Sequence, residues 1–260
     1  MAITVGPAGT GGDSLKGIGV LKELKLDSCE IEFTYGVRMS NALAKQVGEA
    51  AKRDRIKLSI HAPYYINLNS EEKAKIHASK QRILDSCERG HHMAAKCIVF
   101  HAAFYGKSSL EQAYDAVKDA IIDMQKVIKD KKWDVLLCPE TTGKRSQFGD
   151  VDELVRLSKE TKCGICVDFA HLEARYNKKV DYDDVFRKLK ELKHLSEIHC
   201  HFSGIEYTPT GERRHLITPP GKIKELLSAM KKSRMNFNII NESPDPVGDT
   251  IKTKKIRDSL

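Results

Sequence analysis

Six polar residues that could bind metal ions stand at the ends of apolar, β-branched segments of the chain. Each segment closes on an imidazole or a carboxylate, and the series comprises His61, His101, Glu140, Asp168, His199 or His201, and Glu242. Such side chains are rarely buried unless they are paired or bound to metal. Histidine and carboxylate ligation without cysteine suits zinc or manganese, and a carboxylate can bridge two ions. The series therefore predicts a polynuclear metal site.

One of these segments, EIHCHFSGIEY at residues 197–207, contains two candidate ligands, His199 and His201. Side chains two residues apart in a β-strand point to the same face of a sheet. Spacing alone therefore places both imidazoles on one face and does not choose between them.

Two further segments add histidines beyond the strand ends. In DFAH, His171 follows Asp168 by three residues and lies past the strand, so the two side chains are expected to serve neighbouring ions. In GERRH, Glu212 and His215 lie on the loop after the seventh apolar segment. These two residues are the natural partners of His171 at a third site, although the same letters also describe an ordinary charged surface turn.

The segments that carry these residues alternate with segments of helical periodicity. Eight strand candidates occur, at residues 2–8, 28–36, 56–64, 97–104, 134–141, 163–171, 196–204 and 236–243. Capping boxes, Ser109 with Gln112 and Asp150 with Glu153, mark two helix starts between them. Eight such pairs in about 250 residues predict an α/β fold, a single (β/α)8 TIM barrel over residues 1–260, with the metal site at the C-terminal face of the strands. A doubly wound sheet is disfavoured because no G-x-G-x-x-G follows the first strand.

The overall composition is that of a globular enzyme, with 40% hydrophobic and 31% charged residues. No apolar run approaches the ~20 residues of a membrane span, so we expect a cytoplasmic, intracellular protein without a membrane partner. The seven cysteines lie mostly in apolar segments and are expected to be reduced and buried, including the pair Cys163 and Cys166, interpreted as packing residues. The net charge of +8 mildly favours a polyanionic partner such as nucleic acid.

Seven motifs in order along the chain resemble those of one known family. They read SIHAPYYINL, VFHAA, CPETTG, CVDFAHLEARY, IHCHFSG, ERRH and INESP. This series is similar to endonuclease IV, the trinuclear-zinc apurinic/apyrimidinic endonuclease of base-excision repair, in the xylose isomerase-like TIM-barrel superfamily. The resemblance implies a barrel fold, three zinc ions with manganese as an alternative, and a monomer acting on duplex DNA. It further implies hydrolysis of the phosphodiester 5′ to an abasic site by a metal-activated hydroxide.

Carried over by position, the resemblance also implies a ligand set. His61, His101 and Glu140 would hold the first zinc, and Glu140 would bridge to a second. The ligands implied for the second zinc are Glu140, Asp168, His199 and Glu242, with Glu140 and Glu242 as the catalytic carboxylates. His171, His215 and Glu212 would hold the third, where ERRH departs from the family's Asp-x-His motif. His201 is left one pleat nearer the rim, to orient a ligand or contact the lesion phosphate.

The same resemblance assigns DNA contacts. Tyr64 and Tyr65 stand where family residues enter the base stack, and Arg38 where one enters the minor groove, next to a flipped-out sugar. Phosphate contacts are expected from Lys107, Lys144, Arg145 and Arg213. Two alternatives stay open: a metal-dependent sugar isomerase or epimerase on the same barrel, and a noncatalytic DNA-binding relative.

Overall fold

The eight apolar segments form the parallel strands of a closed barrel, so the predicted (β/α)8 fold is confirmed. The computed structural model describes residues 1–260. The barrel strands are β1 (Ile3–Pro7), β2 (Ser28–Glu32), β3 (Lys57–His61), β4 (Cys97–Phe100), β6 (Leu136–Pro139), β8 (Cys166–Asp168), β9 (Ile198–Phe202) and β12 (Phe237–Asn241).

Two parallel ladders, β1-β12-β9-β8 and β2-β3-β4-β6, make up the barrel wall. Isolated parallel bridges join them on both sides, one between Ala8 and Glu30 and one between Glu140 and Cys166. Because the wall is continuous, alternate side chains of every strand point into one shared interior.

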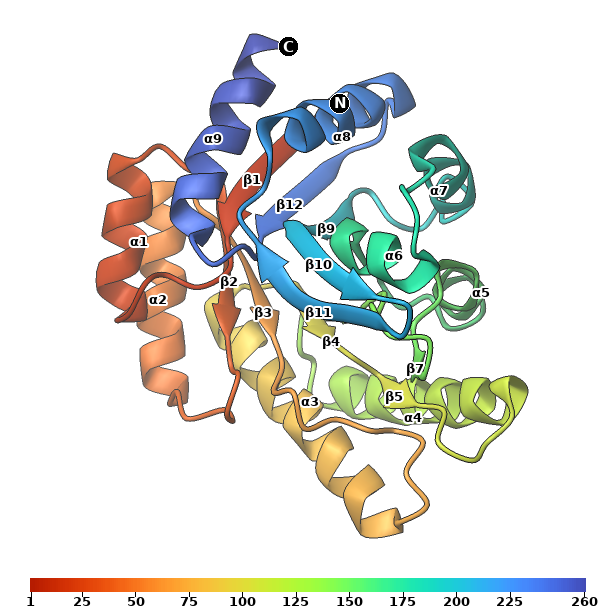
Figure 1. Ribbon diagram of the computed structural model, residues 1–260. Coiled ribbons are helices and arrows are strands. Elements are labelled where there is room, and N and C mark those ends of the chain that lie inside the picture. Colours follow the sequence, from red (N-terminus) through yellow and green to blue (C-terminus); the bar gives the residue numbers. More distant parts are fainter.

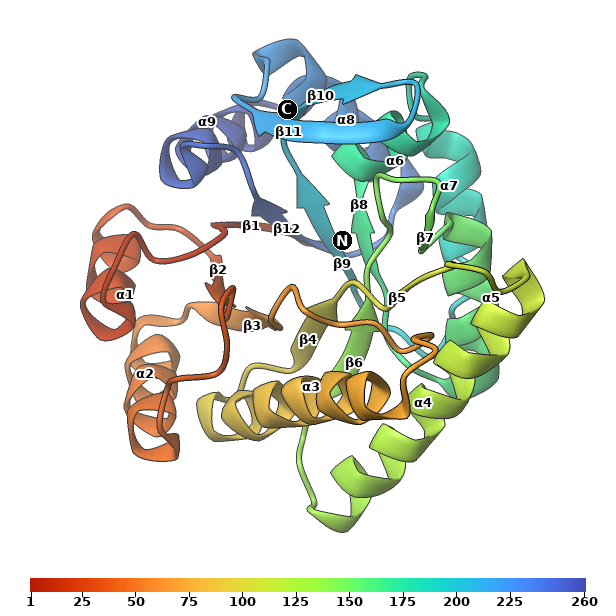
Figure 2. The same cartoon turned by 60° about the horizontal axis from the view of Figure 1, so that its bottom comes forward.

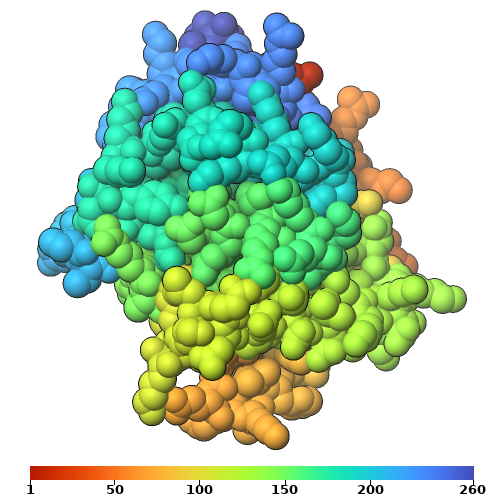
Figure 3. All heavy atoms as spheres, turned by 90° about the vertical axis from the view of Figure 1, so that its right-hand side faces the viewer, coloured from red at the N-terminus to blue at the C-terminus, as the bar shows by residue number.

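Helices pack around the outside of this wall, as Figures 1 and 2 show. The expected capping boxes begin α4 at Ser109 and α5 at Asp150, each contributing on the order of 1 kcal/mol. In Figure 3 the orange, yellow, green and blue parts of the chain follow one another as bands from bottom to top. The helices are α1 (Ser14–Glu23), α2 (Asn41–Asp54), α3 (Lys73–Met93), α4 (Leu110–Asp130), α5 (Val151–Thr161), α6 (Phe169–Tyr176), α7 (Tyr182–Leu189), α8 (Pro220–Ser233) and α9 (Pro246–Ser259). None of them combines the length and the apolar character needed to cross a bilayer.

The apolar core lies between the strands and the helices, where 57 buried residues form one cluster. The barrel interior is different, because bulky aliphatic residues usually fill it, whereas here many inward positions are small, polar or thiol side chains such as Ser59, Cys97 and Cys138. Two cavities result. One of about 470 Å³ opens at the C-terminal mouth, and one of about 490 Å³ opens at the N-terminal base.

Two short accessory sheets flank the mouth. One pairs β5 (Ala103–Phe104) with β7 (Gln147–Phe148), and the other is the hairpin of β10 (Gly204–Thr208) and β11 (Gly211–Leu216). Glu212 and His215 therefore lie in the connection after the seventh barrel strand, where the sequence placed them, but on a strand of this hairpin. The hairpin holds both side chains against the barrel mouth.

Candidate metal centre at the barrel mouth

The first of three ligand groups at the mouth contains the predicted residues His61, His101 and Glu140, whose donor atoms lie within 4.8 Å of one another. One carboxylate oxygen, Oε2 of Glu140, is 3.2 Å from Nε2 of His61 and 2.9 Å from Nε2 of His101. His61 and Glu140 are buried, and His101 is partly exposed to the mouth cavity. These three residues end β3, β4 and β6, so adjacent strands bring them together.

The second group contains Glu140, Asp168 and Glu242 together with His201, and not with His199. Nδ1 of His201 lies 3.1 Å from Oε1 of Glu242 and 3.3 Å from Oε1 of Glu140. The prediction that His199 joins these carboxylates is therefore wrong. The expected DNA contact by His201 is wrong as well, because this side chain has no exposed surface.

Strand register explains this correction. His201 pairs with Asp168 of the neighbouring strand, while His199 pairs with Cys166, one pleat deeper in the barrel. Both imidazoles do face inward, as the spacing predicted. Their height along the barrel axis depends on how neighbouring strands are aligned, and the comparison of motifs misplaced it by two residues.

The third group joins His171 of α6 with Glu212 and His215 of β11. Nε2 of His171 is 3.3 Å from Nε2 of His215 and 3.3 Å from Oε2 of Glu212. Asp168 also reaches this group, because its donor atom lies within 4.8 Å of those of His171 and His215. Asp168 caps α6 by accepting from the backbone N–H of His171, which places that imidazole beside the carboxylate. The expected partners of His171 are thus brought together.

The tautomers of three mouth histidines follow from their backbone partners. Nδ1 of His61, His171 and His215 lies 2.7, 2.9 and 3.1 Å from the carbonyl oxygens of Ala62, Thr141 and Glu242, respectively. A carbonyl oxygen only accepts, so each Nδ1 carries a proton. In the neutral tautomer each Nε2 then presents a lone pair to the mouth.

These lone pairs meet other acceptors. Nε2 of His61 faces the Glu140 carboxylate, and the Nε2 atoms of His171 and His215 face each other. Oδ2 of Asp168 is buried without a hydrogen-bond partner. Acceptors facing acceptors repel unless a proton or a cation lies between them, and imidazole and carboxylate are the usual ligands of zinc. The residues of the mouth therefore fit divalent metal ions.

The close packing of imidazoles and carboxylates at the mouth also shifts their pKa values. Burial opposes ionisation of Glu242, but His201 outweighs it and lowers the pKa of the carboxyl to about 2. Burial also opposes charge on His61, but Glu140 and Glu32 raise the pKa of this imidazole to about 10. Burial dominates at Asp168 and raises its pKa to about 6. Without metal, Glu242 thus stays charged while His61 holds a proton.

The predicted DNA-contacting residues lie at the rim or outside it. Tyr64 and Tyr65 are 55% and 65% exposed on the loop after β3, and Tyr64 lines the mouth cavity. Arg38 is exposed. Arg213 is on the solvent side of the hairpin, with Nη1 2.6 Å from Oε1 of Glu206, so it is already paired within the chain. Among the expected phosphate contacts, Lys144 lines the mouth cavity.

Sequence reasoning missed two carboxylates of β2, Glu30 and Glu32, although their alternation in CEIEF marks one strand face. Glu32 lines the mouth cavity, and burial raises its pKa to about 8. It also missed Gly143, where a Cβ atom would lie 2.6 Å from Cβ of Glu212. A glycine is required there for Glu212 to approach His171.

Comparison with known proteins places the chain among related barrels. The profile of the xylose isomerase-like TIM-barrel family matches residues 18–260. The uncharacterized protein MJ0133 of Methanocaldococcus jannaschii is 35% identical, with 95% of this chain and 93% of that protein covered. The probable endonuclease 4 of Mycoplasmoides gallisepticum is 29% identical, with 72% and 66% covered. The apurinic-apyrimidinic endonuclease 1 of Plasmodium falciparum is 26% identical, with 81% and 38% covered, so the chain spans under two thirds of both endonucleases.

Solved structures share the architecture at low sequence identity. Endonuclease IV from Thermus thermophilus has a TM-score of 0.75 at 17% identity, with 99% of this chain and 100% of that chain covered. A D-tagatose 3-epimerase-like protein has a TM-score of 0.76 at 17% identity, with 98% and 96% covered. These two likenesses establish the barrel fold, which serves more than one chemistry.

Proposed function

The chain belongs to the xylose isomerase-like TIM-barrel family, and from this premise we propose that it is a metal-dependent endonuclease that cuts duplex DNA at abasic sites. The single observation that carries the proposal is the convergence at the mouth of three groups of imidazoles and carboxylates, which are the usual ligands of zinc. The relatives named as endonucleases support a nucleic-acid substrate, as does the net charge of +8.

The ligand groups divide the mouth into three positions. His61, His101 and Glu140 would hold one ion, and Glu140, Asp168, His201 and Glu242 a second. His171, His215 and Glu212 would hold the third, beside Asp168. Divalent ions there would lower the pKa of a water molecule and offset the charge that develops on the phosphate and the leaving oxygen.

The chain's own groups would orient the reaction. Glu140 directs one oxygen to His61 and His101 and the other to His171 and His201, so a single carboxylate couples all three groups. Backbone carbonyls lock the tautomers of His61, His171 and His215, which keeps each Nε2 turned towards the mouth. No side-chain nucleophile is required, because the ligands activate water rather than attack phosphorus.

The rim residues would select the substrate. Tyr64 and Tyr65 expose large aromatic surfaces beside the cavity, and an aromatic ring can stack on a base next to an extruded sugar. Lys144 lines the same cavity and supplies positive charge for a phosphate. An abasic nucleotide is the easiest to extrude, because it has no base to unpair or unstack.

Cleavage of a duplex that carries one tetrahydrofuran abasic analogue tests the proposal. We expect a nick 5′ to the lesion that disappears with chelator and returns with zinc. Glu140→Gln should lower the rate by more than about 100-fold, because even outer-shell partners of metal ligands contribute 10- to 100-fold. Glu191→Gln is a matched control, since Glu191 is exposed and pairs with Lys159 away from the mouth. A zinc-loaded protein that leaves the lesion intact would refute the proposal.

A second candidate is a sugar epimerase, favoured by the structural likeness to a D-tagatose 3-epimerase-like protein. One ion held by Glu140, Asp168, His201 and Glu242 would suffice for that activity. An epimerase with this single ion would leave two pairs of mouth histidines without a role, namely His61 with His101 and His171 with His215. Incubation of the metal-loaded chain with D-tagatose separates the two functions, since epimerisation without nicking would favour the sugar enzyme. Binding of the abasic duplex without either reaction would indicate a noncatalytic DNA-binding protein.

A further inference from the structure

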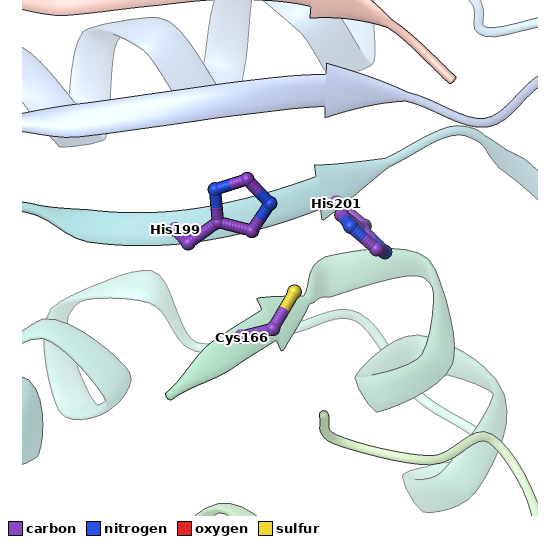
Figure 4. A group of neighbouring side chains, drawn as sticks. All are labelled: Cys166, His199 and His201. Atoms are coloured by element: carbon purple, nitrogen blue, oxygen red, sulfur yellow. The ribbon is translucent and has the colours of Figure 1, made fainter. Parts of the chain in front are cut away.

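A second cluster of potential ligands lies one pleat below the mouth, inside the barrel. Figure 4 shows the thiol of Cys166 on β8 directed towards the imidazoles of His199 and His201 on β9. The sulfur and one ring nitrogen of each histidine lie within 4.8 Å of one another. Cys166 and His201 have no exposed surface, and His199 is 6% exposed.

Glu30 of β2 faces both imidazoles from across the interior. Its Oε2 lies 2.8 Å from Nε2 of His199, and its Oε1 lies 2.8 Å from Nε2 of His201. The second contact is an ion pair that is not aligned as a hydrogen bond, so Oε1 of Glu30 and Nε2 of His201 are both buried without a hydrogen-bond partner. Leaving two such atoms unsatisfied is costly. Donor atoms at this spacing are, however, what a shared cation requires.

The cluster has access to solvent from the opposite end of the barrel. His199 lines the base cavity of about 490 Å³ together with Asn238, Cys97 and Cys138. At its outer edge Lys57 pairs with Glu197 at 2.6 Å, which joins two opposite strands across the base. An ion could therefore reach His199 without passing through the mouth.

Asn238 supports His199 as a ligand. Its side-chain amide lies 3.2 Å from Nδ1 of His199, on the ring edge opposite Glu30. In the structure Nδ2 of the amide faces the ring and donates to Nδ1, and rotating the amide by 180° would turn Oδ1 there to accept from a protonated Nδ1. With Nδ1 protonated, Nε2 is free to bind an ion, which is the usual outer-shell arrangement of a metal-bound histidine.

We propose that Cys166, His199 and His201 form a further metal site for zinc inside the barrel, with Glu30 beside the two imidazoles. Thiolate and imidazole are typical zinc ligands, and three of them leave a fourth tetrahedral position for water or another donor. His201 is shared, because its Nδ1 faces the mouth carboxylates and its Nε2 faces this site. The site gives Cys166 a role that the sequence did not suggest, since both cysteines of the C-x-x-C pair were interpreted as packing residues. It does not depend on the proposed endonuclease activity.

Cobalt substitution distinguishes this site from the mouth. The mouth ligands are all histidine and carboxylate, so only the deeper site places a thiolate on the metal. The full chain, stripped of metal under reducing conditions and titrated with Co²⁺, should develop a near-ultraviolet sulfur-to-cobalt charge-transfer band. Cys166→Ser should abolish the band and should bind one zinc equivalent fewer by elemental analysis.

Two variants serve as controls. Cys163→Ser changes a fully buried thiol outside the cluster and should keep the band. Glu242→Gln removes a ligand of the mouth and should also keep the charge-transfer band. Circular dichroism verifies that each variant is folded, and His199→Gln provides a second route to loss of the band. A cobalt-saturated, folded wild-type chain without the band would overturn the site, as would a band that persists in Cys166→Ser. Neither result would alter metal-dependent nicking, so the two proposals fail independently.

Discussion

The mouth and the base of the barrel differ in chemistry although the same strands supply both. At the mouth, imidazoles and carboxylates from six barrel strands, α6 and the β10–β11 hairpin converge without a thiol. One pleat below, a cysteine and a carboxylate approach His199. His201 and His199 occupy the same face of β9 and are separated by two residues, yet they belong to these different environments. The face of a side chain follows from the local period of the strand, whereas its depth follows from the register of the whole barrel.

The largest effect is expected when each of these two histidines is replaced by alanine in turn. His201→Ala should lower the nicking rate by more than about 100-fold, because it removes a mouth ligand. His199→Ala should lower the rate only about tenfold, because its effect reaches the mouth only through Glu30. Single-turnover cleavage of the abasic duplex at saturating zinc measures both. Equal losses of nicking rate in the two variants would contradict the assignment of His201 to the mouth and His199 to the base.

A pH titration of the metal-free chain tests the charge balance of the mouth. The folded pKa of His61, about 10, exceeds its unfolded value of about 6.5. Its contribution to stability is therefore complete below pH 6.5 and is lost as the pH rises towards 10. The free energy of unfolding should fall by up to about 1.4 kcal/mol per pH unit for this proton.

Urea unfolding between pH 6.5 and 9.5 measures that slope. His61→Gln should flatten it, and zinc should flatten it in the wild-type chain because ligation replaces the proton. A slope that is unchanged in His61→Gln would show that His61 does not hold the proton.

The eight strands and most of the mouth residues were predictable, because period and strand-end position are local properties of the sequence. The depth of His199 was not, since it depends on pairing with Cys166, thirty-three residues earlier in the chain. Glu30 was overlooked because it lies within a strand rather than at its end. The partnership of Glu212 with His171 was predicted, but the hairpin that presents Glu212 and the glycine that admits it were not.

The third ligand group should contribute less than the shared group around Glu140. Glu212→Gln is expected to remove one zinc equivalent and to slow nicking by about 10- to 100-fold, leaving the first two groups occupied. Glu206→Gln, on the paired strand of the same hairpin, contacts Arg213 and Arg214 and should change neither quantity. If Glu212→Gln retained full metal content, the third group would have to rely on Asp168 as its only carboxylate, together with His171 and His215.

The smallest effect is expected at the rim. Tyr64→Ala should weaken binding of the abasic duplex by about 1 kcal/mol or more if the ring stacks on a base. Lys96→Ala is the matched change at the base, where Lys96 is exposed and lines the lower cavity, and it should have little effect. Fluorescence anisotropy at fixed salt measures both affinities. A greater loss of affinity in Lys96→Ala than in Tyr64→Ala would indicate that DNA binds at the base of the barrel rather than at the mouth.

Anomalous diffraction at the zinc edge from zinc-loaded crystals tests the central claim most directly. We expect peaks within about 2.0–2.2 Å of donor atoms in the three mouth groups, with His201 as the imidazole nearest the ion between Glu140, Asp168 and Glu242. A mouth without peaks, or an ion bound by His199 together with Glu242, would contradict the account.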